Sequence, residues 1–78
     1  MNLRESRTYK IVVSTSNAEK IDRINEELAA HQLKVYEHHQ SKTGNTIVGT
    51  WQTIGSSKHH EKFALLMVKD KDIEDFVY

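Results

Sequence analysis

The sequence predicts an α+β fold in which a small, four-stranded, mainly antiparallel sheet carries one long helix on one face. Three observations support this prediction. Residues 8–15 contain three adjacent β-branched residues, which is typical of a strand. Residues 17–30 carry apolar residues three and four positions apart, the spacing of one helix face. Residues 33–68 contain three strand-like stretches separated by two turn sequences. The expected order is therefore β-α-β-β-β, followed by a short C-terminal helix.

The predicted helix has a recognisable start and a less definite end. Ser16 can cap its first turn, and Glu19 stands three residues later at the position of a capping-box partner. No glycine follows the helix, so the sequence leaves its end at residue 30 or 31. The apolar face of the helix consists of Ile21, Ile24 and Leu28.

The last strand-like stretch, residues 59–68, has two interpretations. Residues 63–68 are adjacent apolar residues, and such a run suits a strand that is buried on both faces. We therefore expect a strand, followed by a short helix that Asp70 or Asp72 caps. The alternative is one long helix over residues 58–78, because an apolar run alone does not distinguish a buried strand from a buried helix.

The two predicted hairpins also give a register. Centring them on Thr43 and Ser57 places Val35, Trp51 and Phe63 in one row, on the face that the helix is expected to cover. The other face is expected to be an uncovered apolar patch, which usually marks a site of association. Its members are Tyr36, Val48, Leu66 and Val68. The alternative cover for this face is the terminal helix, folded back onto it.

The order of elements resembles that of a known group of folds. A strand, a helix and a three-stranded meander over about residues 8–72 resemble the ferredoxin-like sheets of small trimeric CutA-type and signalling proteins. The resemblance lies in the order alone, so it implies a layout related to the ferredoxin-like fold and no activity. We expect the chain to be too short for the final helix and strand of that pattern.

Length and composition narrow the class of protein. The chain of 78 residues is expected to form a single domain over residues 1–78, with residues 1–7 mobile. It contains no cysteine, which excludes disulfides and thiolate zinc sites and favours a cytoplasmic location. Its longest apolar run has six residues, whereas a membrane-spanning helix needs about 20. No membrane association is therefore expected.

The charge is balanced overall but uneven along the chain. Eleven basic and eleven acidic residues give a formal charge of zero, which disfavours a dedicated nucleic-acid binder. The first ten residues hold three basic residues and one acidic residue, a net charge of +2. Residues 70–78 hold four acidic residues and one lysine, a net charge of −3. This acidic end is a second candidate surface for a partner.

The histidines do not predict a metal site. His38-His39 and His59-His60 are adjacent pairs, and neighbouring residues on a strand point to opposite faces. Neither pair can therefore chelate one ion. The stretch from Gly55 to His60 resembles the glycine, serine and histidine stretch of small toxin-type ribonucleases of the HicA kind. That resemblance covers these six residues and implies His59 or His60 as a general base.

The function that we expect is a small, non-catalytic binding or regulatory module that acts through protein–protein interaction, as an inhibitor or adaptor. Such proteins are common in bacteriophages and mobile elements. The expected partner is another protein or a second copy of the chain in a homodimer, and no cofactor or metal is expected. The predicted partner-binding residues are Tyr36, Val48, Leu66, Val68, Asp72, Glu74 and Asp75.

Two alternatives remain open. A nucleic-acid-binding protein is the first, and it would use Arg4, Arg7, Lys10, Lys42 and Lys58. A small ribonuclease that depends on a histidine is the second and is less favoured.

Overall fold

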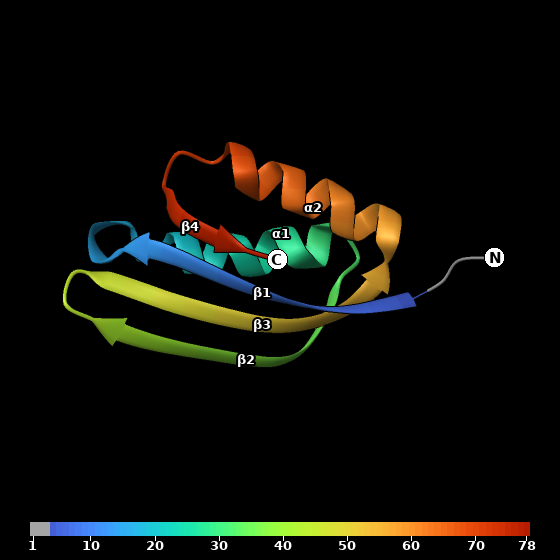
Figure 1. Cartoon of the computed structure of the whole chain (residues 1–78), viewed down its shortest axis with the longest axis horizontal. Helices are drawn as coiled ribbons and strands as arrows, with labels where there is room; N and C mark the ends of the chain where they lie inside the picture. The colour runs from blue at the N-terminus through green and yellow to red at the C-terminus, as the bar shows by residue number, and fades with distance from the viewer. Residues whose placement is uncertain (1–3) are drawn as a thin grey trace.

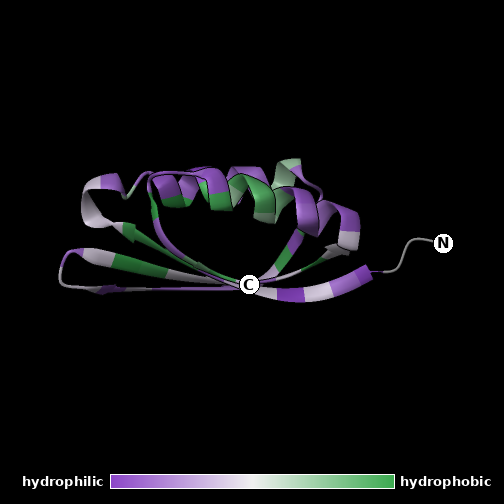
Figure 2. Ribbon diagram, turned by 45° about the horizontal axis from the view of Figure 1, so that its top comes forward, coloured by the Kyte–Doolittle hydropathy of each residue, from purple (hydrophilic) through white to green (hydrophobic). Residues whose placement is uncertain are grey.

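The computed structural model describes residues 4–78, and the order of its elements is β-α-β-β-α-β (Figure 1). The strands are β1 (Arg4–Ser14), β2 (Lys34–Thr43), β3 (Thr46–Ser56) and β4 (Ile73–Val77). The helices are α1 (Lys20–Ala30) and α2 (Ser57–Lys69), and a short 3-10 turn (Thr15–Asn17) precedes α1. The strand order is β2-β3-β1-β4, and every neighbouring pair is antiparallel. Both helices lie on the same side of the sheet, and the other side is uncovered (Figure 2).

Each helix connects two parallel strands that have another strand between them. β3 lies between β1 and β2, and β1 lies between β3 and β4. This arrangement is the split βαβ unit, used twice, of the ferredoxin-like fold. The predicted α+β class, four-stranded antiparallel sheet and ferredoxin-related layout are confirmed. The chain also contains the final helix and strand that we expected it to lack.

The prediction of a strand over residues 59–68 was wrong, because this segment belongs to α2. Ser56 caps the helix by accepting a hydrogen bond from the backbone N–H of His59. The residues that α2 buries are three and four positions apart, as one side of a helix requires. They are His60, Phe63, Ala64 and Met67. The apolar run therefore does not fill both faces of a sheet, because part of it faces solvent.

The predicted terminal helix was also wrong, because β4 occupies its place. A carboxylate oxygen of Asp70 accepts a hydrogen bond from the backbone N–H of Asp72, and this bond turns the chain out of α2. β4 then pairs with the part of β1 from Lys10 to Val13. Ile73 and Phe76 pack against the core on the helix side. The end of the chain therefore does not cover the open face of the sheet.

The start of α1 differs from the predicted capping box. Ser14 rather than Ser16 caps the connection, since its hydroxyl accepts the backbone N–H of Ser16 at the 3-10 turn. Glu19 is the residue before α1, and its side chain makes no capping hydrogen bond. The 3-10 turn delays the helix by about one turn. The apolar side of α1 is buried as expected, through Ile21, Ile24 and Leu28.

α1 ends in a Schellman motif that has glutamine where glycine is usual. Gln32 has φ = 59°, in the left-handed region. The backbone N–H of Leu33 donates to the carbonyl of Leu28 at 2.9 Å, and that of Gln32 donates to Ala29 at 3.0 Å. Leu33 is buried at the end of the motif. A side chain in this backbone conformation costs on the order of 1 kcal/mol.

The observed pairing of β2 with β3 differs from the predicted register by three residues at Trp51. Trp51 lies opposite His38, not Val35. The hairpin turn is shorter than expected, because β2 and β3 pair up to Thr43 and Thr46 and leave only two residues between them. An irregularity in β2 at Tyr36 then shifts the phase of this strand.

β1 begins earlier than the sequence indicated. Its pairing with β3 starts at Arg4 opposite Ser56. Residues 4–7, which were expected to be mobile, therefore belong to the sheet. Residues 1–3 lie outside the described part of the chain. Within residues 4–78, neither helix is long and apolar enough to cross a membrane.

The core forms between the helices and the inner face of β1 and β3, and Trp51 is at its centre. The Trp51 ring lies against the backbone of Gly49, where a Cβ atom would overlap it. The indole N–H donates to Asn25 of α1 at 2.8 Å, and His38 of β2 stacks on the ring with centroids 4.5 Å apart. The buried apolar residues are Tyr9, Ile11, Val13, Ile21, Ile24, Leu28, Leu33, Trp51, Phe63 and Met67.

Replacing the glutamine of the Schellman motif should stabilise the protein. We expect Gln32→Gly to raise the free energy of unfolding by about 0.5–1 kcal/mol, because glycine adopts the left-handed region without strain. Urea unfolding monitored by circular dichroism measures this change. Ala30→Gly, two residues earlier within the helix, is the control and should lower the free energy by about 1 kcal/mol. Equal effects of the two variants would contradict the assignment of the motif.

Adding a methyl group at Gly49 should destabilise the protein. We expect Gly49→Ala to lower the free energy of unfolding by about 1–3 kcal/mol, because the Trp51 ring must move out of a filled core. Trp51 is the only tryptophan, so its fluorescence reports the displacement as a shift to longer wavelength. Thr50→Ala, at the next position but on the open face, is the control. An unchanged emission spectrum in Gly49→Ala would refute this packing.

Candidate functional site

Exposed apolar side chains gather on the outer side of α2 and at the end of the chain. Leu65 is 56% exposed, Val68 59% and Tyr78 71%. Together with neighbouring residues they line an open hollow of about 310 Å³ between α2 and β1. We call this hollow the edge hollow. Its lining residues are Arg7, Glu61, Ala64, Leu65, Val68 and Tyr78.

The edge hollow lies beside a stretch of β1 that has a neighbouring strand on one side only. β3 pairs with β1 along its whole length, whereas β4 pairs only with the part from Lys10 to Val13. Figure 1 shows β1 extending well beyond β4 toward its own start, beneath the first half of α2. We call residues 4–8 the free edge, since no described strand pairs with them on the β4 side. Such an edge is a template for another strand.

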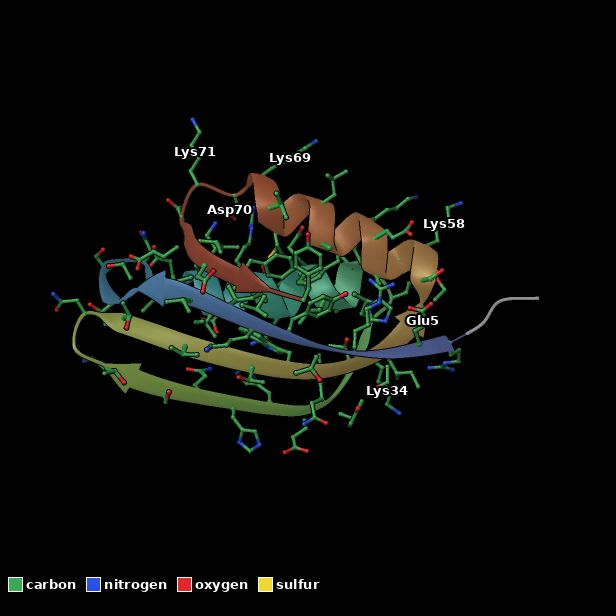
Figure 3. The ribbon with its side chains drawn as sticks, viewed as in Figure 1. Glu5, Lys34, Lys58, Lys69, Asp70 and Lys71 are labelled. Atoms are coloured by element: carbon green, nitrogen blue, oxygen red, sulfur yellow. The ribbon has the colours of Figure 1, made fainter. Side chains whose placement is uncertain are left out.

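One ion pair marks the inner side of the free edge. Both Nε and Nη2 of Arg7 donate to the same carboxylate oxygen of Glu5, at 3.0 and 2.8 Å. The hydrogen bond to Glu5 raises the pKa of Arg7, and this effect outweighs the opposing effect of burial. Glu5 lies at the start of β1, below the first turn of α2 from which Lys58 projects (Figure 3). Both side chains are partly exposed, so the pair contributes little to stability.

His60 is a structural residue of the core and not an accessible base. Its Nε2 contacts the Glu5 carbonyl at 2.9 Å, and because a carbonyl only accepts, Nε2 must donate. Nδ1, the other ring nitrogen, then accepts from the Tyr9 hydroxyl at 2.6 Å. Burial raises the pKa of Tyr9, so this phenol keeps its proton and remains a donor at neutral pH. His60 is fully buried, and both of its ring nitrogens are occupied.

The other histidines are not brought together either. His59 lies in the first turn of α2, where its backbone makes the capping bond. His38 stacks on Trp51, while His39 contacts Glu37 on the exposed edge strand β2. His31 donates to the carbonyl of the preceding helical turn. Among residues 4–78, no three histidine or acidic side chains lie close enough to hold a metal ion.

The structure divides the predicted apolar patch between two layers. Tyr36 and Val48 lie on the open face of the sheet, where the Tyr36 hydroxyl reaches across β3 to the Ser6 hydroxyl at 2.7 Å. Leu66 and Val68 lie on α2, in the other layer. The four residues therefore cannot form one surface. Val68 lines the edge hollow, whereas Leu66 faces the cleft between the helices.

The acidic and basic candidates are also dispersed. Asp72 forms an ion pair with Lys20 at 3.5 Å, whereas Glu74 and Asp75 are exposed on β4. Of the residues proposed for nucleic-acid binding, Arg7 lies in the edge hollow and Lys58 in the first turn of α2. The strand alternation places Arg4 and Lys10 on the open face, and Lys42 lies near the tip of the β2–β3 hairpin. The five cations do not form one stripe.

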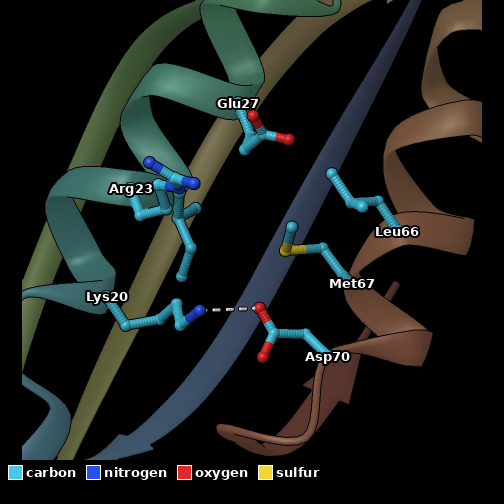
Figure 4. Close-up of a pocket in the computed structure, with 7 residues that line it drawn as sticks. Lys20, Arg23, Glu27, Leu66, Met67 and Asp70 are labelled. Carbon is cyan, nitrogen blue, oxygen red and sulfur yellow. Dashed lines mark hydrogen bonds and ion pairs between the residues drawn. The ribbon is translucent and has the colours of Figure 1, made fainter.

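A second, smaller hollow of about 180 Å³ lies between α1 and α2, and an ion pair closes one end of it (Figure 4). Nζ of Lys20 contacts a carboxylate oxygen of Asp70 at 2.9 Å. Burial alone would raise the pKa of Asp70, but the hydrogen bonds from Lys20 and Asp72 and the charge of Lys20 together lower it. The same hydrogen bond raises the pKa of Lys20. The pair ties the start of α1 to the end of α2, and no charge in it remains free for a ligand.

The ion pair of Lys20 and Asp70 should make the free energy of unfolding depend on pH. Since the pKa of Asp70 in the folded protein lies below its ordinary value of 3.8, the unfolded chain binds more protons between the two values. The stabilisation is therefore complete above about pH 5 and is lost as the pH falls through this range. We expect Lys20→Met to cost about 1 kcal/mol at pH 7 and much less at pH 2.5. Chemical denaturation at both values measures it, with Lys62→Met as the control. A cost independent of pH would contradict the pairing.

Comparisons with known proteins show a likeness of fold. No protein-family model matches the sequence, and no curated protein matches it. The solution structure of the C-terminal domain of the MgtC protein from Mycobacterium tuberculosis superposes with a TM-score of 0.70. The identity is 11%, and the match covers 97% of this chain and 85% of that one. The ACT domain from GTP pyrophosphokinase of Chlorobium tepidum gives a TM-score of 0.67 at 12% identity, over 95% and 84% of the two chains. The chain therefore shares its α+β architecture with these domains.

Proposed function

We propose that this chain is a small, non-catalytic binding module of the regulatory, inhibitor or adaptor type, and that the edge hollow is its surface for a partner protein. The observation that carries this proposal is where the exposed apolar side chains lie. Tyr36 lies on the open face, but the other large exposed hydrophobic residues lie on α2 or at the end of the chain. They are Leu65, Leu66, Val68, Val77 and Tyr78. A helix on a domain surface ordinarily exposes polar residues, and an apolar group of this kind usually marks an interaction site.

The energetics of the edge hollow also favour a protein partner. Burying the exposed parts of Leu65 and Val68 would contribute on the order of 1 kcal/mol each. The hollow is open and lacks the enclosing walls of a typical small-molecule site. The pair of Arg7 and Glu5 supplies polar groups at its rim. An apolar centre with a polar rim is the usual composition of a protein interface.

The fold likeness supports the role of a module. Both solved structures described above are named as domains of larger proteins. We propose that this fold serves here to bind rather than to catalyse. The occupied ring of His60 supports the same interpretation, because it leaves the HicA-like stretch without its second candidate base.

Two neighbouring leucines on α2 provide a matched test. Leu65 lines the edge hollow and Leu66 lies on the other side of the helix, so the same substitution probes two different surfaces. We expect both Leu65→Asp and Leu66→Asp to fold, because both side chains are exposed. A photo-crosslinking phenylalanine derivative at position 68 should give a discrete adduct in cells that make the protein. This adduct should persist in Leu66→Asp and disappear in Leu65→Asp.

The controls define what would contradict the proposal. The same crosslinking residue at position 50, on the open face, should give no such adduct. An adduct that survives Leu65→Asp, or one that forms equally from position 50, would show that the edge hollow is not the surface. Circular dichroism spectra of all variants must agree with that of the unchanged protein, so that loss of the adduct reports loss of contact.

A further inference from the structure

We infer that the partner of the edge hollow presents an acidic, extended peptide segment, which adds to the free edge of β1 as a strand in line with β4. This inference rests on the proposed function, since it names the chemistry of the partner for the same surface. Four features of the structure support it: the unpaired strand, the apolar hollow above it, the local charge and the composition of β4.

The free edge is the part of β1 that a longer β4 would pair with. β4 runs antiparallel to β1, and its last paired residue, Val77, lies opposite Lys10. A strand entering on the same side beyond Tyr78 would face residues 4–8 of β1. Peptides often bind by adding a strand to such an edge, where backbone hydrogen bonds hold the peptide and alternate side chains are read by pockets. Backbone groups alternate in direction along β1, and Thr15 donates to Asn45 on the β3 side, so the groups that face the free side are those of Ser6 and Thr8.

The edge hollow fits the alternate side chains of such a strand. Side chains of a strand point in turn to the two faces of the sheet, so every second residue of the peptide would point toward α2. There it would meet Ala64, Leu65 and Val68, which are apolar. The remaining side chains would point to the open face and into solvent. The hollow therefore selects apolar side chains on the face of the strand that points toward α2. In β4, the register irregularity at Val12 and Val13 places both Ile73 and Phe76 on that face.

The free edge and α2, the two segments that border the hollow, each carry a net positive charge, although the chain as a whole is neutral and residues 70–78 are acidic. The free edge holds Arg4 and Arg7 against Glu5, a net charge of +1. Residues 57–69, which form α2, hold three lysines against one glutamate, a net charge of +2. Lys58 and Lys69 project outward from the helix (Figure 3). An acidic peptide is therefore attracted to this side of the molecule, and a basic one is repelled.

β4 itself shows what this side of β1 accepts. Its sequence is Ile-Glu-Asp-Phe-Val, which combines two acidic residues with apolar ones. Ile73 and Phe76 pack inward against the core, while Glu74 and Asp75 remain exposed. Phe76 stacks on Tyr9 of β1 with ring centroids 5.7 Å apart. A partner strand of the same composition would continue this packing from Tyr9 toward the start of β1.

A synthetic peptide can test this inference with the full chain. The probe is Asp-Ile-Glu-Asp-Phe-Val-Tyr, which copies residues 72–78, and its binding is followed by nitrogen-15 NMR titration. We expect shifts at residues 4–8 and along the outer side of α2. Binding should weaken about tenfold when salt is raised to screen the charges. A peptide with lysine at the three acidic positions should bind at least tenfold more weakly than the probe. A peptide with proline at its centre cannot pair as a strand and should bind no better than the lysine peptide.

Two protein variants complete the test. Arg7→Gln should weaken binding about fivefold, whereas Lys34→Gln, which removes a cation from the far edge strand β2, should leave it unchanged. Equal binding of the acidic and lysine peptides would overturn the inference. Shifts confined to β4 and its pairing region on β1 would also overturn it, because the probe would then have replaced β4 instead of extending it.

The outcomes separate this inference from the proposed function. If the probe fails to bind but the crosslinked adduct still depends on Leu65, the edge hollow remains a protein-binding surface and only the acidic strand is wrong. If the adduct fails as well, both are wrong. A single-stranded oligonucleotide of the same charge that binds tightly to this side while the peptide does not would assign the positive surface to nucleic acid and overturn the inference.

Discussion

The hydrogen bond between Tyr9 and His60 is the interaction on which the arrangement of this domain depends. It joins the central strand β1 to α2 inside the core, where neither group could be left without a partner. Since His60 must face the sheet to make this bond, Phe63 and Met67 face it too, at helical spacing. The same rotation of the helix turns Leu65 and Val68 outward. The packed side and the candidate binding side of α2 are thus set by one buried contact.

Much of the fold could be predicted from local patterns. The apolar spacing in α1 and the β-branched centre of β1 each indicate their element within a few residues, because both signals lie in contiguous sequence. The helix side of Trp51 could also be predicted, since the richer face of a strand is the one that a helix covers. The second helix, α2, could not be predicted. His60 is one of the residues that α2 buries, but histidine is not counted as an apolar residue in a sequence pattern. The run from Phe63 to Val68 therefore indicated a strand.

The candidate site was harder to predict than the fold because it depends on contacts distant in sequence. The predicted register was wrong by three residues, since the position of the two-residue hairpin turn leaves little trace in the sequence, and the irregularity at Tyr36 that reduces the difference to two residues leaves none. Val68 was found for its exposure, although its predicted neighbours Tyr36 and Val48 lie in the other layer. Leu65 and the free edge were missed. A helical plot of residues 57–69 that counts His60 as buried would have shown Leu65 and Val68 on the outer side.

The shortness of β4 has a consequence for the motions of the domain. A strand of five residues with one partner is held by few backbone bonds, and here its anchors are Ile73, Phe76 and the turn at Asp70. Local openings of this kind require far less free energy than global unfolding. The amides of β4 should therefore exchange with solvent before those of β1 and β3, and each opening would briefly double the length of edge that β1 presents. The sheet thus has three strands with fixed pairing, β2, β3 and β1, and a fourth strand, β4, whose pairing fluctuates.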